Sequence, residues 1–202
     1  MKKKALAEKP LKQYLTFFLA VFCFTVTVNS QVTSNRFTFD IFTQEDGLPN
    51  NQVQCIYQDK KGWLWIGTSQ GLSRFDGYSF VNFLPNPSDS SSLRGNLVRV
   101  IREDSRGNLL VGTENGGLNV FDRTKERFSH PLMQNSPGHL FQDISVNDIE
   151  EDKQGNLWLG TDYNILVVDT TGKITPLSPR MTGSDFEFEG NFVRILQFDQ
   201  KG

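Results

Sequence analysis

Apolar and polar positions alternate in short runs along most of the chain after residue 50. The runs at 53–57 (VQCIY), 63–68 (WLWIGT) and 98–102 (VRVIR) are rich in valine, isoleucine and aromatic residues and are bounded by glycine, asparagine or aspartate. Short alternating runs with such boundaries predict β-strands. No stretch has apolar residues at helical spacing over a useful length, so we expect an all-β chain.

The same sequence pattern recurs along the chain, and its copies align without a gap. VQCIYQDKKGWLWIGT (53–68), VRVIREDSRGNLLVGT (98–113) and VNDIEEDKQGNLWLGT (146–161) align residue for residue, and a further copy begins at 193. The turn aspartates Asp59, Asp104, Asp152 and Asp199 are 45, 48 and 47 residues apart. A steady period of this length is typical of a β-propeller. We expect the chain to be a piece of a repeat array that stops inside a repeat.

Each unit contains four strand-like segments. In the first unit these are 53–57, 63–68, a segment that starts at Gly71, and a segment that follows the Asp76-Gly77 turn, a strong hairpin signal. Four short antiparallel strands form one propeller blade. The expected fold is a partial β-propeller of about three blades at 31–202. A lone outer strand at 37–43 precedes them, and the start of a fourth blade follows.

Two features of the repeat are predicted to be structural. The aspartate of each D-x-x-G turn is expected to bond backbone amides, with glycine at the fourth turn position. A bulky column fills the space between blades, and a glycine column lets the neighbouring blade come close. Gly71, Gly117 and Asn164 share a further column, for which we predict positive φ. The bulky column is Trp65, Leu110 and Trp158; the other structural residues are Asp59, Gly62, Gly67, Asp104, Gly107, Gly112, Asp152, Gly155 and Gly160.

Residues 1–30 are predicted to be a secretory signal. Five lysines precede an apolar run at 14–28, and Val28 and Ser30 suit cleavage after Ser30. An uncleaved anchor is the alternative, although a span needs about 20 residues. The remaining chain has 16 basic and 22 acidic residues, which argues against a nucleic-acid partner. It retains one cysteine, Cys55, which we interpret as a small core residue.

The amino-acid sequence of the repeat resembles the two-component regulator propeller repeat, and the resemblance covers residues 36–202. The motifs that carry this resemblance are GLPNN at 47–51, D-x-x-G-x-L-W-I-G-T, and G-L-x-R-F-D-G. In that family, propellers form the periplasmic sensor of hybrid histidine kinases that respond to polysaccharide breakdown products. The resemblance therefore implies a periplasmic sensor segment without catalysis of its own. Its partners would be an oligosaccharide-like ligand and the remaining blades, membrane span and kinase core of a homodimeric parent.

The four strands of a blade are expected to run alternately up and down, so the loops of the blade fall into two groups, one at each edge of the sheet. The turns between second and third strands are expected to share one edge with the connections to the next blade, which include 84–95, 131–143 and 176–189. Polar, variable loops on one side of a repeat array are the usual binding surface. The candidate ligand-binding residues are Gln70, Arg94, Glu114, Asn115, Asp162 and Tyr163. A polar column in the first strands either lines a central channel or satisfies backbone groups; it consists of Gln54, Arg99, Asn147 and Arg194.

Two other functions remain open from the sequence. One is an exported glycosidase or lyase; a glycosidase would need a close pair of carboxylates or a tyrosine with a base, and no pair is singled out among the many acids. A protein-interaction scaffold is the other alternative. His130 and His139 lie in a proline- and glycine-containing loop, unlike a phosphoacceptor helix, and without a ligand-spaced partner they do not indicate a metal site. We expect no cofactor and no metal.

Overall fold

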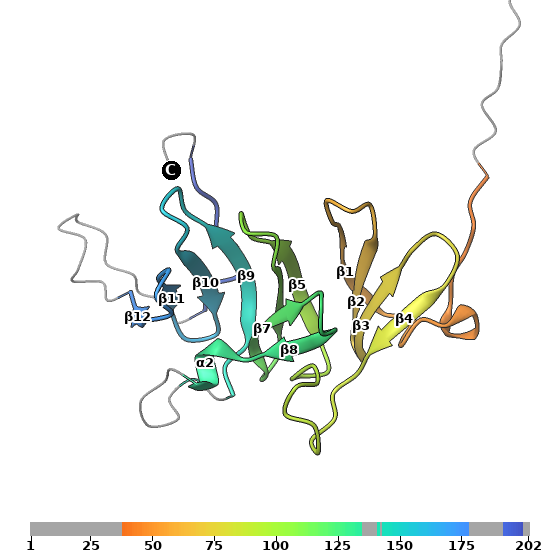
Figure 1. Ribbon diagram of the computed structural model, residues 1–202, viewed down its shortest axis with the longest axis horizontal. Coiled ribbons are helices and arrows are strands. Elements are labelled where there is room, and N and C mark those ends of the chain that lie inside the picture. Colours follow the sequence, from red (N-terminus) through yellow and green to blue (C-terminus); the bar gives the residue numbers. More distant parts are fainter. Residues whose placement is uncertain (1–37, 135–140, 142, 178–191, 200–202) are drawn as a thin grey trace, which may run out of the picture. The chain divides into compact units, whose positions relative to one another are not determined.

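The computed structural model describes residues 38–134, 141, 143–177 and 192–199. The predicted signal segment, His139 and most of the 176–189 connection lie outside these residues. From Ile41 onward the described residues belong to one compact unit. Its strands form three four-stranded antiparallel sheets, and the strands of each sheet follow one another in chain order (Figure 1). This is the blade meander that the repeat predicts.

The strands are short and occur at the repeat period. The first sheet contains β1 (Val53–Gln58), β2 (Leu64–Thr68), β3 (Gly71–Phe75) and β4 (Phe80–Phe83). The middle sheet contains β5 (Val98–Glu103), β6 (Leu109–Thr113), β7 (Gly117–Asp122) and β8 (Arg127–Ser129). The third sheet contains β9 (Val146–Glu151), β10 (Leu157–Thr161), β11 (Ile165–Val168) and β12 (Ile174–Pro176).

The D-x-x-G turns join the first and second strands of each sheet. In the first sheet, Asp59 Oδ1 accepts hydrogen bonds from the backbone N–H groups of Lys61 (2.9 Å) and Trp63 (3.0 Å). Gly62 follows with φ of 87°, a left-handed conformation that glycine adopts without steric cost. The corresponding glycines of the other two turns have φ of 85° and 84°. The predicted role of the aspartate and glycine is confirmed in all three repeats.

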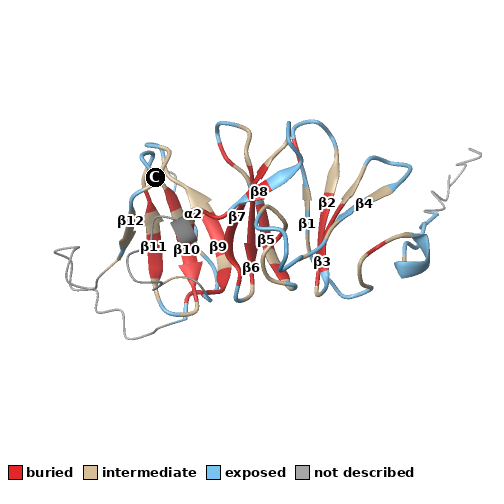
Figure 2. Cartoon of the chain, turned by 60° about the horizontal axis from the view of Figure 1, so that its bottom comes forward, coloured by how far each residue is buried: buried red, intermediate tan, exposed pale blue. Residues whose placement is uncertain are grey.

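Neighbouring sheets pack face to face, with β1 against β5 and β5 against β9. Trp65 is fully buried in the core between the first two sheets, and Leu110, at 2% exposed, lies in the core between the second and third. Trp158 is half-buried and packs edge-on against Phe198. The middle sheet is mostly buried, whereas β1 is partly exposed (Figure 2). The prediction that the bulky column is core is therefore confirmed for Trp65 and Leu110, whereas Trp158 is only partly covered.

Two segments predicted as strands form no β-ladder. Residues 38–43 are extended without a strand assignment and lead into the 3₁₀ turn η1 (Gln44–Asp46), capped by Thr43. Residues 192–199 likewise have no assigned strand, although the Val193 side chain packs over Gly160 as the repeat predicts. The Val193 N–H donates one backbone hydrogen bond to the Thr161 carbonyl of β10 (2.9 Å), but a strand needs a ladder of such bonds, and neither segment has a ladder among the described residues.

Two further expectations differ from the structure. The prediction of positive φ holds for Gly71 and Gly117 but is wrong for Asn164. The Asn164 carbonyl accepts a backbone hydrogen bond from the Thr161 N–H (3.0 Å), and its side-chain Oδ1 accepts from the Ile165 N–H (2.7 Å), so the turn closes without positive φ. The 131–143 connection, predicted as a loop, begins with a single helical turn, α2 (Pro131–Gln134). Across the described part of the chain, no helix has the length and apolar character to cross a membrane.

Candidate functional site

Two kinds of connection meet along one edge of the sheets, which we call the loop edge. The turn between β6 and β7 begins at Glu114, whose N–H bonds the carbonyl of Leu97 (2.9 Å), the residue before β5. The same backbone bond joins Ser69 to Gln52 (3.1 Å) in the first sheet. The D-x-x-G turns lie at the other end of these strands. The structure thus confirms the predicted grouping of the loops.

One hollow at this edge, the turn hollow, has a volume of about 410 Å³. It lies between the β2–β3 turn, the β6–β7 turn and the residues before β5. Three predicted site residues, Gln70, Glu114 and Asn115, line it together. The other lining residues are Ser69, Gly95, Asn96 and Leu97. The structure therefore brings residues from two neighbouring repeats to one polar surface.

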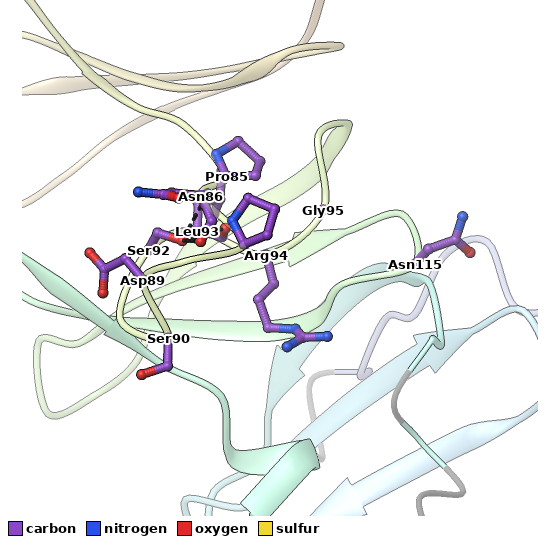
Figure 3. Close-up of a pocket in the computed structure, with 10 residues that line it drawn as sticks. Pro85, Asn86, Asp89, Ser90, Ser92, Leu93, Arg94, Gly95 and Asn115 are labelled. Atoms are coloured by element: carbon purple, nitrogen blue, oxygen red, sulfur yellow. Dashed lines mark hydrogen bonds between the residues drawn. The ribbon is translucent and has the colours of Figure 1, made fainter.

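A second hollow, the loop hollow, has a volume of about 350 Å³ and lies along the connection from β4 to β5 (Figure 3). Arg94 and Asn115, both predicted site residues, line it. Its remaining wall is formed mainly by prolines, serines and polar side chains of residues 85–93. The two hollows adjoin, because Gly95 and Asn115 line both.

The backbone at this junction is tightly constrained. Gly95 has φ of 77°, and a Cβ atom there would lie 2.5 Å from the Glu114 carbonyl oxygen, so only glycine fits. Asn115 also has a left-handed φ of 53°, which asparagine tolerates better than most residues. Its N–H donates to Ser145 Oγ (3.2 Å). These contacts fix the position of both residues at the hollow.

The polar column of the first strands forms a third hollow, the inner-strand hollow, of about 240 Å³. The column residues Gln54, Arg99, Asn147 and Arg194 all line it. Asn147 also satisfies a backbone group, because its Nδ2 donates to the Val193 carbonyl (2.9 Å). The interpretation that the column satisfies backbone groups is thus confirmed at Asn147.

The acids of the loop edge pair with this column. Arg99 donates to Glu114 Oε1 (2.5 Å), and Asn147 Nδ2 donates to Asp162 Oδ1 (3.1 Å). Glu114 therefore connects the turn hollow to the inner-strand hollow, and its negative charge is balanced by Arg99. Asp162 and Tyr163 line neither the turn hollow nor the loop hollow, and Tyr163 is 68% exposed.

Sequence reasoning missed Asn96 and Leu97 in the turn hollow and the serines of the loop hollow. Asn96 has a signal that could have revealed it, because it aligns with Asn51 two residues before the first strand of its repeat. Ser90 and Ser92 have none, since the length and sequence of this connection differ from repeat to repeat.

Two titratable groups near the core are held uncharged. Burial raises the pKa of the Cys55 thiol to about 11, so the group stays protonated and is a poor nucleophile. Burial, together with the neighbouring Arg94 charge, lowers the pKa of His130 below its ordinary value. Within the described ranges, no group of three histidine, cysteine or acidic residues is arranged to hold a metal ion.

Comparisons with known proteins agree with the repeat pattern. A family model described as two component regulator propeller matches residues 47–70, 92–115 and 139–163. Histidine kinase P4 of Formosa agariphila is 40% identical over 77 residues, which is 38% of this chain and 6% of that protein. The chain therefore spans a small part of this curated relative.

Solved structures share the fold. The extracellular domain of BT3049 from B. thetaiotaomicron, described as a hybrid two component system, is 31% identical with a TM-score of 0.61. The match covers 70% of this chain and 20% of that one. The extracellular domain of BT4673 from the same organism is 24% identical with a TM-score of 0.64, over 83% of this chain and 22% of that one, and shows the fold alone. Repeat motifs, blade structure and family match agree: the chain carries two-component regulator propeller repeats.

Proposed function

We propose that the chain is the ligand-sensing propeller segment of an exported two-component sensor that responds to oligosaccharides released from polysaccharides. The repeats support the sensor assignment, as does the likeness to the extracellular domain of BT3049. In this proposal the parent protein is a homodimeric histidine kinase, and the described blades lie on the periplasmic side. The segment itself binds ligand and performs no catalysis.

The turn hollow is the observation that carries the ligand assignment. Amide, hydroxyl and carboxylate groups converge there from Ser69, Gln70, Asn96, Glu114 and Asn115. These groups offer both hydrogen-bond donors and acceptors, as the hydroxyl groups of a sugar require. The volume of about 410 Å³ is within the range of small-molecule sites.

The geometry also favours binding over chemistry. Glu114 is the acid of the turn hollow, and its ion pair with Arg99 fixes the orientation of the carboxylate. A glycosidase needs a second carboxyl group across the scissile bond, at about 5 to 9.5 Å from the first. Neither the turn hollow nor the inner-strand hollow has a second acid in its described lining. A fixed carboxylate among amides is suited to accept hydrogen bonds from sugar hydroxyls.

Thermal-shift screening of the complete exported domain against a panel of polysaccharide-derived oligosaccharides tests the proposal. A ligand that binds the native state raises the unfolding temperature in a concentration-dependent way. We expect at least one oligosaccharide to do so. If no glycan in a panel of neutral and acidic oligosaccharides raises the unfolding temperature, the proposed ligand class is wrong.

Substitution of Gln70 tests the position of the site. Gln70→Ala removes one neutral hydrogen-bonding group from the turn hollow and is expected to weaken binding of the identified glycan by about 3- to 10-fold. Gln154→Ala is the matched control, since Gln154 is an exposed amide in a D-x-x-G turn, at the opposite edge of the sheets. Titration calorimetry measures both. Unchanged affinity in Gln70→Ala, or an equal loss in Gln154→Ala, contradicts the assignment to the turn hollow.

A further inference from the structure

Arg94 lines the loop hollow without a counter-charge. Its Nε atom is buried and has no hydrogen-bond partner, and within the described ranges no acceptor or carboxylate pairs with the rest of its guanidinium group. Figure 3 shows the group without a hydrogen bond to the other residues drawn. Five other arginines have a carboxylate partner: Arg74, Arg99, Arg102, Arg106 and Arg123. Burying part of an unpaired charge is costly, so Arg94 requires a different explanation.

The backbone of Arg94 is held rigidly from the middle sheet. Its N–H donates to Asn119 Oδ1 (2.8 Å), and its carbonyl accepts from Thr113 Oγ1 (2.6 Å). Asn119 and Thr113 are both fully buried. The Arg94 carbonyl also lies so close to Gly116 that a side chain at 116 would clash with it. The point from which the guanidinium extends is therefore fixed before any ligand arrives.

An arginine at this position is not needed by the repeat itself. When the repeats are aligned on the first valine of each first strand, Arg94 corresponds to Pro49 and Gln142. The first repeat thus forms its blade with proline there. In the first repeat, β3 has Ser73 at the position of Asn119 in the middle sheet. The hydrogen bond from the Arg94 N–H to the Asn119 side chain therefore has no counterpart in the first repeat.

The charged neighbours of Arg94 are engaged elsewhere. Asp89, which also lines the loop hollow, accepts hydrogen bonds from the N–H (2.9 Å) and hydroxyl (2.7 Å) of Ser91 and faces the charge of Arg127. Glu114 pairs with Arg99. His130 is 7% exposed and uncharged at neutral pH, because burial and the Arg94 charge lower its pKa. The positive charge of Arg94 is left for a ligand.

We propose that the loop hollow is a subsite for the acidic group of a saccharide, a carboxylate or a sulfate ester, and that Arg94 binds this group. Planar guanidinium groups bind both kinds of oxyanion through paired N–H donors. The neutral hydroxyl groups of the same ligand then occupy the adjoining turn hollow, across Gly95 and Asn115. This inference rests on the proposed function and adds the charge of the ligand to it.

Calorimetric titration of the complete exported domain with three matched sets of oligosaccharides tests this subsite. The probes are a neutral galactan tetrasaccharide, a galacturonate tetrasaccharide and a sulfated galactan tetrasaccharide. We expect one of the two acidic probes to bind at least 10-fold more tightly than the neutral one, and the identity of that probe distinguishes carboxylate from sulfate. We also expect the acidic preference to weaken as salt concentration rises.

Substitution of Arg94 locates the preference. Arg94→Gln is expected to reduce acidic-probe affinity about 10- to 100-fold and to change neutral-probe affinity little, because a charge-assisted hydrogen bond is lost. Arg94→Lys keeps the charge and should retain part of the preference. Arg106→Gln makes the same change in net charge at the opposite edge, where Arg106 pairs with Asp104, and should leave the preference intact.

The outcomes separate this inference from the proposed function. Glycan binding with no preference for either acidic probe, or an acidic preference that survives in Arg94→Gln, overturns the subsite but leaves the sensor proposal standing. Absence of binding to all three probes and to the wider panel removes both. The preference of the unsubstituted protein is itself decisive, so the test does not depend on the variants folding.

Discussion

At the residue scale, Asp59 shows how one side chain joins a turn to the core. Its Oδ1 binds backbone amides within the turn, and its Oδ2 accepts from the Trp65 indole N–H (2.8 Å) and from Arg123 (2.6 Å) of the next repeat. Asp152 holds Trp158 in the same way (3.0 Å). The aspartate therefore positions both the hairpin and the bulky residue between the sheets.

Replacement of Asp59 should be strongly destabilising. Asp59→Ala leaves the Trp65 indole N–H without its buried acceptor and removes one of two carboxylates that pair with Arg123, which keeps Glu103 (3.1 Å), so the expected loss is about 3 kcal/mol. Asp76→Ala, which removes an exposed turn acceptor for the Tyr78 and Ser79 amides, is the matched control and should destabilise the fold much less. Urea unfolding of the exported domain measures both. Equal losses in the two variants would contradict the role assigned to Asp59.

The stability contributed by Asp59 also depends on pH. Burial alone would raise the pKa of Asp59, but hydrogen bonds from Trp65 and Arg123 outweigh it and hold the pKa below its ordinary value of 3.8. A lowered carboxyl pKa stabilises the folded state above the unfolded pKa, and this stability is lost as pH falls through the folded pKa. The stability difference between the unsubstituted protein and Asp59→Asn should therefore shrink from pH 7 towards pH 3.

At the scale of single elements, a glycine in each second strand sets the distance between sheets. A Cβ atom at Gly112 would lie 2.8 Å from both Cγ1 and the carbonyl oxygen of Val146, the first residue of β9. A Cβ atom at Gly67 would lie 2.6 Å from the Cγ1 atom of Val98, which is the first residue of β5. The first strand of each sheet thus packs directly on the glycine of the preceding sheet.

Alanine at these glycines should destabilise by different amounts. Gly112→Ala forces a methyl group against a backbone carbonyl as well as two valine side chains, and we expect a loss of about 1 to 3 kcal/mol. For Gly160→Ala the three nearest atoms all belong to Val193, the closest at 2.9 Å and the other two at 3.4 Å, so this substitution should cost less. Unfolding midpoints of the two variants give the comparison. A Gly112→Ala protein as stable as the parent would show that the sheets do not pack this closely.

The elements could be predicted where their causes are local. The alternation of the strands and the D-x-x-G turn can both be recognised within a single repeat, and both predictions are confirmed. The segment at 37–43 is predicted as a strand from the phase of the repeat, but a ladder needs a partner strand, and residues 38–43 have none among the described residues. The turn at Asn164 keeps a backbone hydrogen bond from Thr161 (3.0 Å) but closes without the positive φ that the glycine column predicts.

At the scale of the whole compact unit, one apolar face remains uncovered among the described residues. Ile56 of β1 is 63% exposed, whereas Ile101, its equivalent in β5, is 1% exposed beneath the first sheet. Val53 and Val98 differ in the same way, at 42% and 0%. The comparison shows how much burial one further blade provides to the sheet beside it.

The candidate site could be predicted only in outline. The alternating direction of the strands predicts that Gln70, Glu114 and Asn115 share one edge, and the structure brings them to one hollow. The ion pair of Glu114 with Arg99 joins residues 15 positions apart, and the hydrogen bond from the Arg94 N–H to Asn119 joins residues 25 positions apart. Such contacts follow from how the strands pair, so no single-repeat pattern could reveal them.

Hydrogen–deuterium exchange of the complete exported domain, with and without a bound oligosaccharide, tests the central claim most directly. If the loop edge is the sensing surface, ligand should slow amide exchange in residues 93–97, 69–71 and 114–117, and leave the D-x-x-G turns at 60–62, 105–107 and 153–155 unchanged. Slowed exchange confined to the D-x-x-G turns, or no change in any of these segments with ligand bound, would contradict the account.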